Sequence, residues 1–312
     1  RRSLLAGGAA VVSVDAAPLK SVQKMEHRVR VEDFRAAGDS DLTVLRRAFK
    51  SLPPTGGIVE FANDKVYQIG RFENDHPIFV FAGCSNLELR GNGSSIELET
   101  SNITQPVVFF FQSFRNVRIS GLRGHDRGAD ISRDWRGMRF IVADSSLGVC
   151  EGIELDDIHV ENAVALFAAQ GIGSRISGIT LRNVTAVRCY YGINCMENGD
   201  DLTADFTAID CRRAYFVYGV SRHSVAIDIR QGKGAIGAQA SCLIKRYRRD
   251  TTDIRLRARF AGVGDGPARA AIEESALSEG YRELQKRIEA LRSEHGGVRL
   301  VVEDAGGRVI PE

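Results

Sequence analysis

The chain has 312 residues, of which 43% are hydrophobic and 26% are charged, a composition that is ordinary for a soluble globular protein. Its length suits one large solenoid or two ordinary domains, and its formal net charge of +2 gives no reason to expect nucleic acid as a partner. The sequence has no Gly-x-Ser-x-Gly elbow, no phosphate-cradling loop, no Cys-x-x-Cys pair and no metal-ligand spacing among its histidines, so we predict no resident metal.

Residues 1–17 resemble an export signal. Arg1-Arg2-Ser3-Leu4-Leu5 precedes an apolar run that ends in small residues near Ala16, which is the pattern of a twin-arginine signal without its leading residues. The run is far shorter than the roughly 20 residues that a membrane span needs. We therefore expect a bacterial periplasmic or secreted protein with no membrane span. An apolar N-terminus with no targeting role is the alternative.

Residues 28–72 are predicted to form an N-terminal module with one helix. Apolar residues recur at helical spacing from Leu42 to Leu52, and Pro53-Pro54 ends the helix. Two short strands follow, at residues 58–61 and 67–69. The candidates for the N-cap are Asp39, Ser40 and Asp41.

This module resembles a known family. The order Asp-Phe-x-Ala-x-Gly-Asp at residues 33–39, then a helix, Gly-Gly-x-Val-x-Phe at 56–61 and Tyr-x-Ile at 67–69 is similar to the start of pectate-lyase-superfamily proteins. The resemblance implies a right-handed parallel β-helix that acts on polysaccharides, with the helix capping the open end of the coil. Such a cap makes physical sense because an uncapped end would expose unpaired strand edges.

Residues 73–265 repeat one pattern. Asn-Leu-Glu-Leu-Arg-Gly at 86–91 returns in similar form at 116–121, 152–157 and 178–183, and shorter copies begin at Asp201, Ser224 and Asp253. The alternation of apolar and polar residues predicts half-buried strands, and Asn or Asp at their ends suits tight corners. A coil of this kind cannot bury its apolar side alone, so we expect the coils to stack into one solenoid.

Five short apolar segments lie between these copies, and each carries one bulky polar side chain. Successive members are 26, 27, 21 and 21 residues apart, which is the period of a solenoid. We therefore predict that they form one column on the surface. The five residues are Asp144, Gln170, Glu197, Tyr218 and Gln239.

The predicted column offers acid/base chemistry. Asp144 and Glu197 lie two coils apart, so their backbones would be roughly 10 Å apart, and their carboxyl groups could approach the ~6.5–9.5 Å of an inverting glycosidase. Gln170 and Gln239 would bind sugar hydroxyls, and Tyr218 would stack on a sugar ring or act as a general acid or base. The alternative is a row of polar residues that bond to one another on a solvated surface.

A lyase would use a second group of residues. His125, Arg127, Arg133, Arg136 and Arg139 cluster in one connection together with Trp135, and Lys245 follows later. A lyase on uronic-acid polymers needs cations to neutralise the carboxylate and a base to take a proton. We predict no cofactor, although a lyase could use calcium. In this reading Arg139, Lys245 and Trp135 contact substrate. A solvated loop anchored by Trp135 is the alternative.

Gly199-Asp200-Asp201 supplies alternative acids. The triplet resembles the Gly-Asp-Asp motif of polygalacturonases, in which two acids are catalytic. That family also has an Asn-x-Asp motif one coil earlier and a Gly-His-Gly motif one coil later. Here Asn194 is not part of such a motif, and His223 stands between Arg and Ser. Asp200 and Asp201 also precede a strand directly, so a structural corner is the alternative.

Residues 266–312 change pattern. Apolar residues from Ala270 to Ser293 have helical spacing, Gly296-Gly297 ends the helix, and residues 298–302 form a strand. We expect the helix to cover the C-terminal end of the solenoid or to pack on its side.

The sequence thus predicts an exported carbohydrate-active enzyme, either a glycoside hydrolase or a polysaccharide lyase, on a parallel β-helix. Its partner would be a polysaccharide or oligosaccharide. The rival prediction, from a different class, is a non-catalytic glycan-binding or cell-surface structural protein on the same fold.

Overall fold

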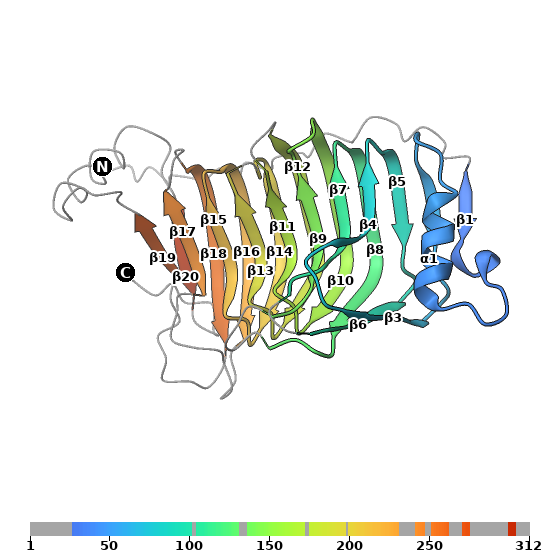
Figure 1. The fold of residues 1–312 in the computed structure, drawn as a ribbon. Helices are drawn as coiled ribbons and strands as arrows, with labels where there is room; N and C mark the ends of the chain where they lie inside the picture. Colours follow the sequence, from blue (N-terminus) through green and yellow to red (C-terminus); the bar gives the residue numbers. More distant parts are fainter. Residues whose placement is uncertain are drawn as a thin grey trace, which may run out of the picture.

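The computed structural model describes residues 27–101, 104–130, 136–171, 175–197, 199–230, 241–246, 251–261, 270–274 and 299–303. The strands of these residues stack in parallel into a parallel β-helix, which confirms the predicted fold class (Figure 1). The proposed export signal lies outside the described residues.

Two sheets form the walls of the coil. Sheet A runs the length of the solenoid and contains both arms of the early coils, because β5 and β6 pair with the two halves of one long strand, β8. Its strands are β1 (Arg28–Arg30), β2 (Gly57–Glu60), β3 (Val66–Phe72), β5 (Ser85–Arg90), β6 (Ser95–Thr100), β8 (Arg115–Asp126), β10 (Cys150–Glu161), β12 (Ile176–Val187), β14 (Leu202–Ile209), β16 (Ser221–Arg230), β18 (Thr252–Ala261) and β20 (Arg299–Glu303).

Sheet B closes the opposite side, and its neighbouring strands pair in parallel and come one coil apart in the sequence. Its strands are β4 (Pro77–Ala82), β7 (Val107–Gln112), β9 (Arg139–Asp144), β11 (Ala165–Gln170), β13 (Tyr191–Met196), β15 (Arg213–Tyr218), β17 (Cys242–Arg246) and β19 (Ala270–Glu274).

The interior between the sheets is apolar along the whole stack. Leu155 of sheet A and Phe167 of sheet B belong to one continuous buried cluster that also includes Cys189 and Cys211. All six cysteines are unpaired, and burial raises the pKa of the Cys195 thiol to about 12. The sequence interpretation of Cys189 and Cys211 as stacked interior residues is confirmed, and their burial as thiols argues against a reactive role.

Corners of the coil use left-handed backbone. Asn86, Asn116, Asp201 and Asp253 lie at the starts of β5, β8, β14 and β18 with φ of 52°, 54°, 54° and 53°. Asn and Asp tolerate this conformation better than most residues, and the Asn116 amide also donates a 3.0 Å hydrogen bond to the Asn86 amide oxygen one coil below. The prediction that Asn and Asp mark the corners is confirmed.

Sheet A changes shape along the stack. A second left-handed residue bends the middle of three long strands: Gly121 in β8, Asp157 in β10 and Asn183 in β12. No positive φ occurs in the middle of β14, β16 or β18, whose backbones are all described. The pairing of β12 with β14 accordingly shifts register after Leu181. The bent coils therefore give way to straighter ones at β14.

Helix α1 (Asp41–Lys50) covers the N-terminal end of the solenoid, as predicted (Figure 1). Its N-cap is Ser40, whose hydroxyl accepts a hydrogen bond from the Thr43 N–H. Phe49 projects into the first coils, where its ring packs edge-on against Phe79 with centroids 4.8 Å apart. The short 3₁₀ helix η1 (Val31–Phe34) precedes α1.

The prediction of a helix starting at Ala270 is wrong for its first turn. Residues 270–274 form β19, which extends sheet B by pairing with β17, because the ladder bonds of a stacked strand outweigh even the high helix propensity of Ala and Glu. The rest of the predicted helix lies outside the described residues. The strand predicted at 298–302 is present as β20.

Candidate functional site

Three of the five residues predicted to form the column, Asp144, Gln170 and Tyr218, lie at the carboxyl ends of sheet B strands. The register pairs Gln112 with Asp144, Asp144 with Gln170, and Met196 with Tyr218. Ala169 pairs with Cys195, so Gln170 and Met196 follow at neighbouring positions. We call this line the strand-end row; in coil order it contains Ala82, Gln112, Asp144, Gln170, Met196, Tyr218, Lys245 and Glu273.

Two of the five predicted members of the column are not in this row as the structure describes it. Met196 takes the place assigned to Glu197, which lies one residue beyond the end of β13 with φ of 66° and donates its N–H to the Tyr218 carbonyl at 2.8 Å. Gln239 lies outside the described residues, and Lys245 holds the position beside Tyr218. The coils differ in length, and the step from Tyr218 to its register partner Lys245 is 27 residues (245 − 218) rather than the predicted 21.

Asp144 is the best-defined acid of the row. It is 6% exposed, and its carboxylate accepts hydrogen bonds from the Ser146 N–H at 2.8 Å and the Gln170 amide at 3.2 Å. Burial alone would raise the pKa of Asp144, but hydrogen bonds from Ser146, Gln170 and Gln112 outweigh it and lower that pKa. Asp144 is therefore an anion at neutral pH and is suited to act as a base or to stabilise positive charge.

A hydrogen bond between Arg139 and Gln170 joins opposite ends of two neighbouring strands of sheet B. The Arg139 guanidinium donates a 3.3 Å hydrogen bond to the Gln170 amide oxygen. Because Arg139 begins β9 and Gln170 ends β11, the two side chains must lie along the outer face of the sheet between them. Burial lowers the pKa of Arg139, while the charges of Asp75 and Asp144 oppose that shift. Arg139, Gln170 and Asp144 thus form a continuous hydrogen-bonded chain.

The middle of the outer face of sheet B is buried. Val142 is 0% exposed and Phe216 8%, and both belong to a second apolar cluster separate from the interior. The Tyr191 and Phe216 rings stack with centroids 5.3 Å apart, and the Arg213 guanidinium lies over Phe216 at 5.2 Å. The half-buried side chains on this face are instead concentrated at the strand ends, in Gln112, Gln170, Met196 and Tyr218.

Asp200 and Asp201 have the geometry of a corner. Asp200 is 1% exposed, and its carboxylate accepts a hydrogen bond from the Ser221 N–H at 2.8 Å and pairs with Arg175 at 3.2 Å. Asp201 is half-buried in left-handed backbone and pairs with Arg222. These contacts hold the chain at the start of β14. They agree with the reading of the Gly-Asp-Asp triplet as a structural corner rather than as catalytic acids.

The basic connection is tied down by a buried acid. The Asp126 carboxylate accepts N–H groups from Thr100, Gly128 and Met138 at 3.0, 2.9 and 2.8 Å, which fixes both ends of the connection. His125 bonds to Asn162. Arg133 and Trp135 lie outside the described residues, as does the side chain of Lys245.

A calcium ion has no evident site in the part of the chain that the structure describes. No three His, Cys, Asp or Glu side chains gather there to hold a metal. No chemical step below depends on a metal ion. No helix among the described residues has the length and apolarity to cross a membrane.

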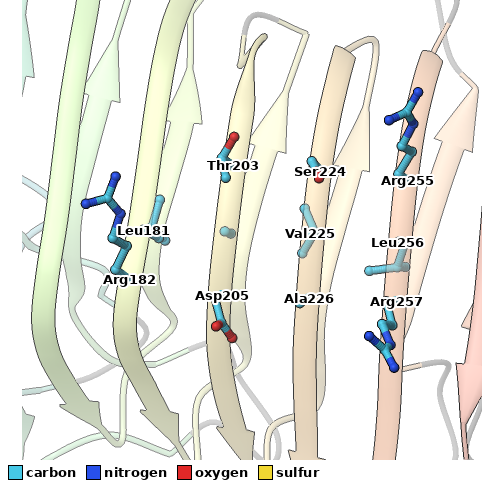
Figure 2. Close-up of a pocket in the computed structure, with 11 residues that line it drawn as sticks. Leu181, Arg182, Thr203, Asp205, Ser224, Val225, Ala226, Arg255, Leu256 and Arg257 are labelled. Carbon is cyan, nitrogen blue, oxygen red and sulfur yellow. The ribbon is translucent and has the colours of Figure 1, made fainter. Parts of the chain in front are cut away.

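Sequence reasoning missed two features. Gln112 ends an apolar run of the same kind as Asp144 and Gln170, so extending the column one coil toward the N-terminus would have found it. The second is a groove of about 540 Å³ on the outer face of sheet A, between β12 and β18 (Figure 2). Its outward-facing polar residues are Arg182, Thr203, Asp205, Ser224, Arg255 and Arg257.

The sequence matches no protein-family model and no curated protein. Among solved structures the chain is similar to an endo-xylogalacturonan hydrolase from Aspergillus tubingensis, at 13% identity, over 81% of this chain and 100% of that one, with a TM-score of 0.25. A likeness at that TM-score carries no argument about the reaction.

Proposed function

We propose that this protein is an exported carbohydrate-active enzyme that binds a polysaccharide along the strand-end row and cleaves it by acid/base chemistry. The observation that supports the proposal is the hydrogen-bonded chain of Arg139, Gln170 and Asp144, which presents an anionic carboxylate beside half-buried polar side chains. Parallel strands place neighbouring members of the row about 4.8 Å apart, so successive coils can contact successive parts of one extended ligand.

In the hydrolase version Asp144 is the base and Glu197 the acid. The lowered pKa of Asp144 keeps it ionised at neutral pH, so the proton for the leaving oxygen must come from another group. Glu197 lies just beyond the row, two coils from Asp144, with backbones about 10 Å apart. That separation leaves room for a water molecule between the two carboxyl groups, as an inverting mechanism requires. Gln170, on the intervening coil, would hold a sugar hydroxyl.

In the lyase version Tyr218 takes the proton. Lys245 occupies the neighbouring register position and would neutralise the substrate carboxylate. Tyr218 is three coils from Asp144, about 14 Å along the stack, so Asp144 would bind substrate rather than share the same bond with Tyr218. Trp135 and Gln239 keep their proposed roles in substrate binding.

Substitution of the two acids tests the proposal. We expect Asp144→Asn and Glu197→Gln each to lower kcat/KM about 100-fold or more on the polysaccharide that the wild type degrades. Asp228→Asn, on the outer face of sheet A, is the matched control and should keep wild-type activity. A lyase releases products with a conjugated double bond that absorbs in the near ultraviolet, and a hydrolase does not. Full activity in both acid variants would end the acid-pair mechanism.

The second candidate function is a non-catalytic glycan-binding protein on the same fold. Two observations favour it: apolar Met196 stands in the middle of the row in place of the expected acid, and the outer face of sheet B beside the row is a buried apolar cluster. This candidate predicts saturable oligosaccharide binding with no release of reducing ends or unsaturated products from any polymer. Screening acidic and neutral polysaccharides for both binding and turnover separates the two.

A further inference from the structure

The groove on sheet A lies where the bent coils meet the straighter ones. Small side chains form its floor, chiefly Thr203 on β14 and Ser224 and Ala226 on β16. Long side chains border it, with Arg182 of β12 on one side and Arg255 of β18 on the other (Figure 2). Asn183, next to Arg182, has left-handed backbone, and the pairing of β12 with β14 shifts register between Leu181 and Val184. The hollow therefore lies beside an irregularity of the backbone.

The border of the groove is cationic. Arg255 and Arg257 are two residues apart on β18 and are both exposed, so their side chains project from the same outer face. Arg182 is also exposed, and its contact with Glu154 at 3.6 Å is a surface pair of small energetic value. Asp205 is the acid among the lining residues.

The dimensions favour an extended ligand. Arg182 and Arg255 stand on β12 and β18, which are three strand spacings apart, or about 14 Å. A single phosphate or carboxylate cannot contact both. The groove is also lined without any aromatic side chain, whereas proteins that bind single-stranded nucleic acid stack bases on aromatic rings.

We propose that this groove is a second binding site, which takes an extended anionic polysaccharide through its carboxylate or sulfate groups. Arg182 and Arg255 bind the anionic groups at the two borders, since guanidinium suits bidentate contact with both. Thr203 and Ser224 present hydroxyls to the sugar between them. The site lies on a different sheet from the strand-end row and does not depend on whether that row is catalytic.

Binding measurements test the site directly. Polygalacturonate oligosaccharides are titrated calorimetrically into the full chain, with dextran as the neutral comparison and heparin as the sulfated one. We expect both anionic ligands to bind and dextran not to bind. Arg182→Gln and Arg255→Gln should each weaken binding about tenfold, and the affinity should fall as salt is raised. Ser224→Glu, which adds a negative charge to the floor, should abolish binding.

Arg123→Gln is the matched control, because Arg123 is an exposed arginine on the outer face of the same sheet but on β8. It should bind like the wild type, and circular dichroism should show all variants folded. Equal weakening in Arg123→Gln, unchanged binding in both groove variants, or tighter binding of a DNA oligonucleotide than of either glycan would overturn the proposal. Repeating the titration with Asp144→Asn separates the two sites. If Asp144→Asn loses binding while Arg255→Gln keeps it, the ligand binds at the strand-end row, and the groove is refuted as a binding site.

Discussion

The outer faces of the two sheets differ although the same coils build both. On sheet A, exposed residues alternate with buried ones, as in β14, where Thr203 and Asp205 are exposed and Ala204 is buried. On sheet B nearly every position is buried, as in β11, where Ala168 is 1% exposed although it faces away from the interior. Strands buried on both faces read as continuous apolar runs, and half-buried strands alternate. The sequence pattern of each strand therefore reports what its outer face contacts.

This difference separates two kinds of surface. Sheet A offers an exposed, hollowed and cationic face. From β7 to β15, sheet B has its half-buried polar groups at the strand ends, around an apolar cluster that behaves as a second core. A ligand on sheet B must therefore run along the edge of the sheet, whereas a ligand on sheet A can lie across several strands.

The largest expected effect comes from one substitution made on both faces. Ala168→Lys places a charge in the second apolar cluster and should lower the free energy of unfolding by about 4 kcal/mol or more. Ala226→Lys, on the outer face of sheet A, should change it by less than about 0.5 kcal/mol. Urea denaturation of the two variants measures both values. Similar stability losses would show that the two outer faces do not differ in burial.

Much of the fold could be predicted from local pattern. The alternation at residues 86–91 and its later copies set the strands of sheet A, because each copy must bury one side. The corners could be predicted because Asn and Asp tolerate left-handed backbone. The capping helix could be predicted because the first coil would otherwise expose unpaired strand edges. These features depend on a few adjacent residues, which is why the sequence alone was enough.

The site depended on register, which a sequence does not show. Moving one residue, from Glu197 to Met196, changes which side chain enters the row, and only the pairing with Tyr218 decides it. The groove required knowledge of four separate strands and of the bend at Asn183 in β12. The helix predicted at Ala270 failed for a related reason, since pairing with a preceding coil decided that segment.

A buried histidine links the inner faces of the two sheets. His223 of β16 is 1% exposed; its Nε2 donates to the Gly199 carbonyl, and its Nδ1 accepts from the Tyr215 hydroxyl of sheet B at 2.7 Å. Burial lowers the pKa of His223 to about 4, against the opposing effect of Gly199, Asp200 and Asp201. Because the folded pKa lies below the unfolded value, protonation favours unfolding.

The stability that neutral His223 provides is therefore complete above about pH 6.5 and is lost as the pH falls toward 4. We expect it to account for about 3 kcal/mol of the destabilisation between pH 7 and pH 4. His223→Gln keeps a neutral hydrogen-bonding side chain that does not titrate, so its stability should fall correspondingly less over that range, whatever its stability at pH 7. Thermal or urea unfolding at several pH values measures the difference. Parallel pH profiles for the wild type and the variant would show that water reaches His223.

The smallest expected effect sharpens the contrast between the polar edge and the apolar middle of sheet B. Gln170→Met copies Met196 into the preceding coil, so it preserves volume while removing the hydrogen bonds to Asp144 and Arg139. We expect a loss of about 1 kcal/mol and a rise in the pKa of Asp144 toward its ordinary value, because one of the bonds that lowers it is gone. The stability that Asp144 provides is present above its unfolded pKa and is lost as the pH falls through its folded one, so the acid-dependent loss should shrink in the variant.

Carboxyl-carbon NMR titration measures the pKa, and Met196→Gln, which removes no hydrogen bond of Asp144, is the control. If Asp144 titrates unchanged in Gln170→Met, its ionisation is set by Ser146 and Gln112, and the row does not act as one connected unit.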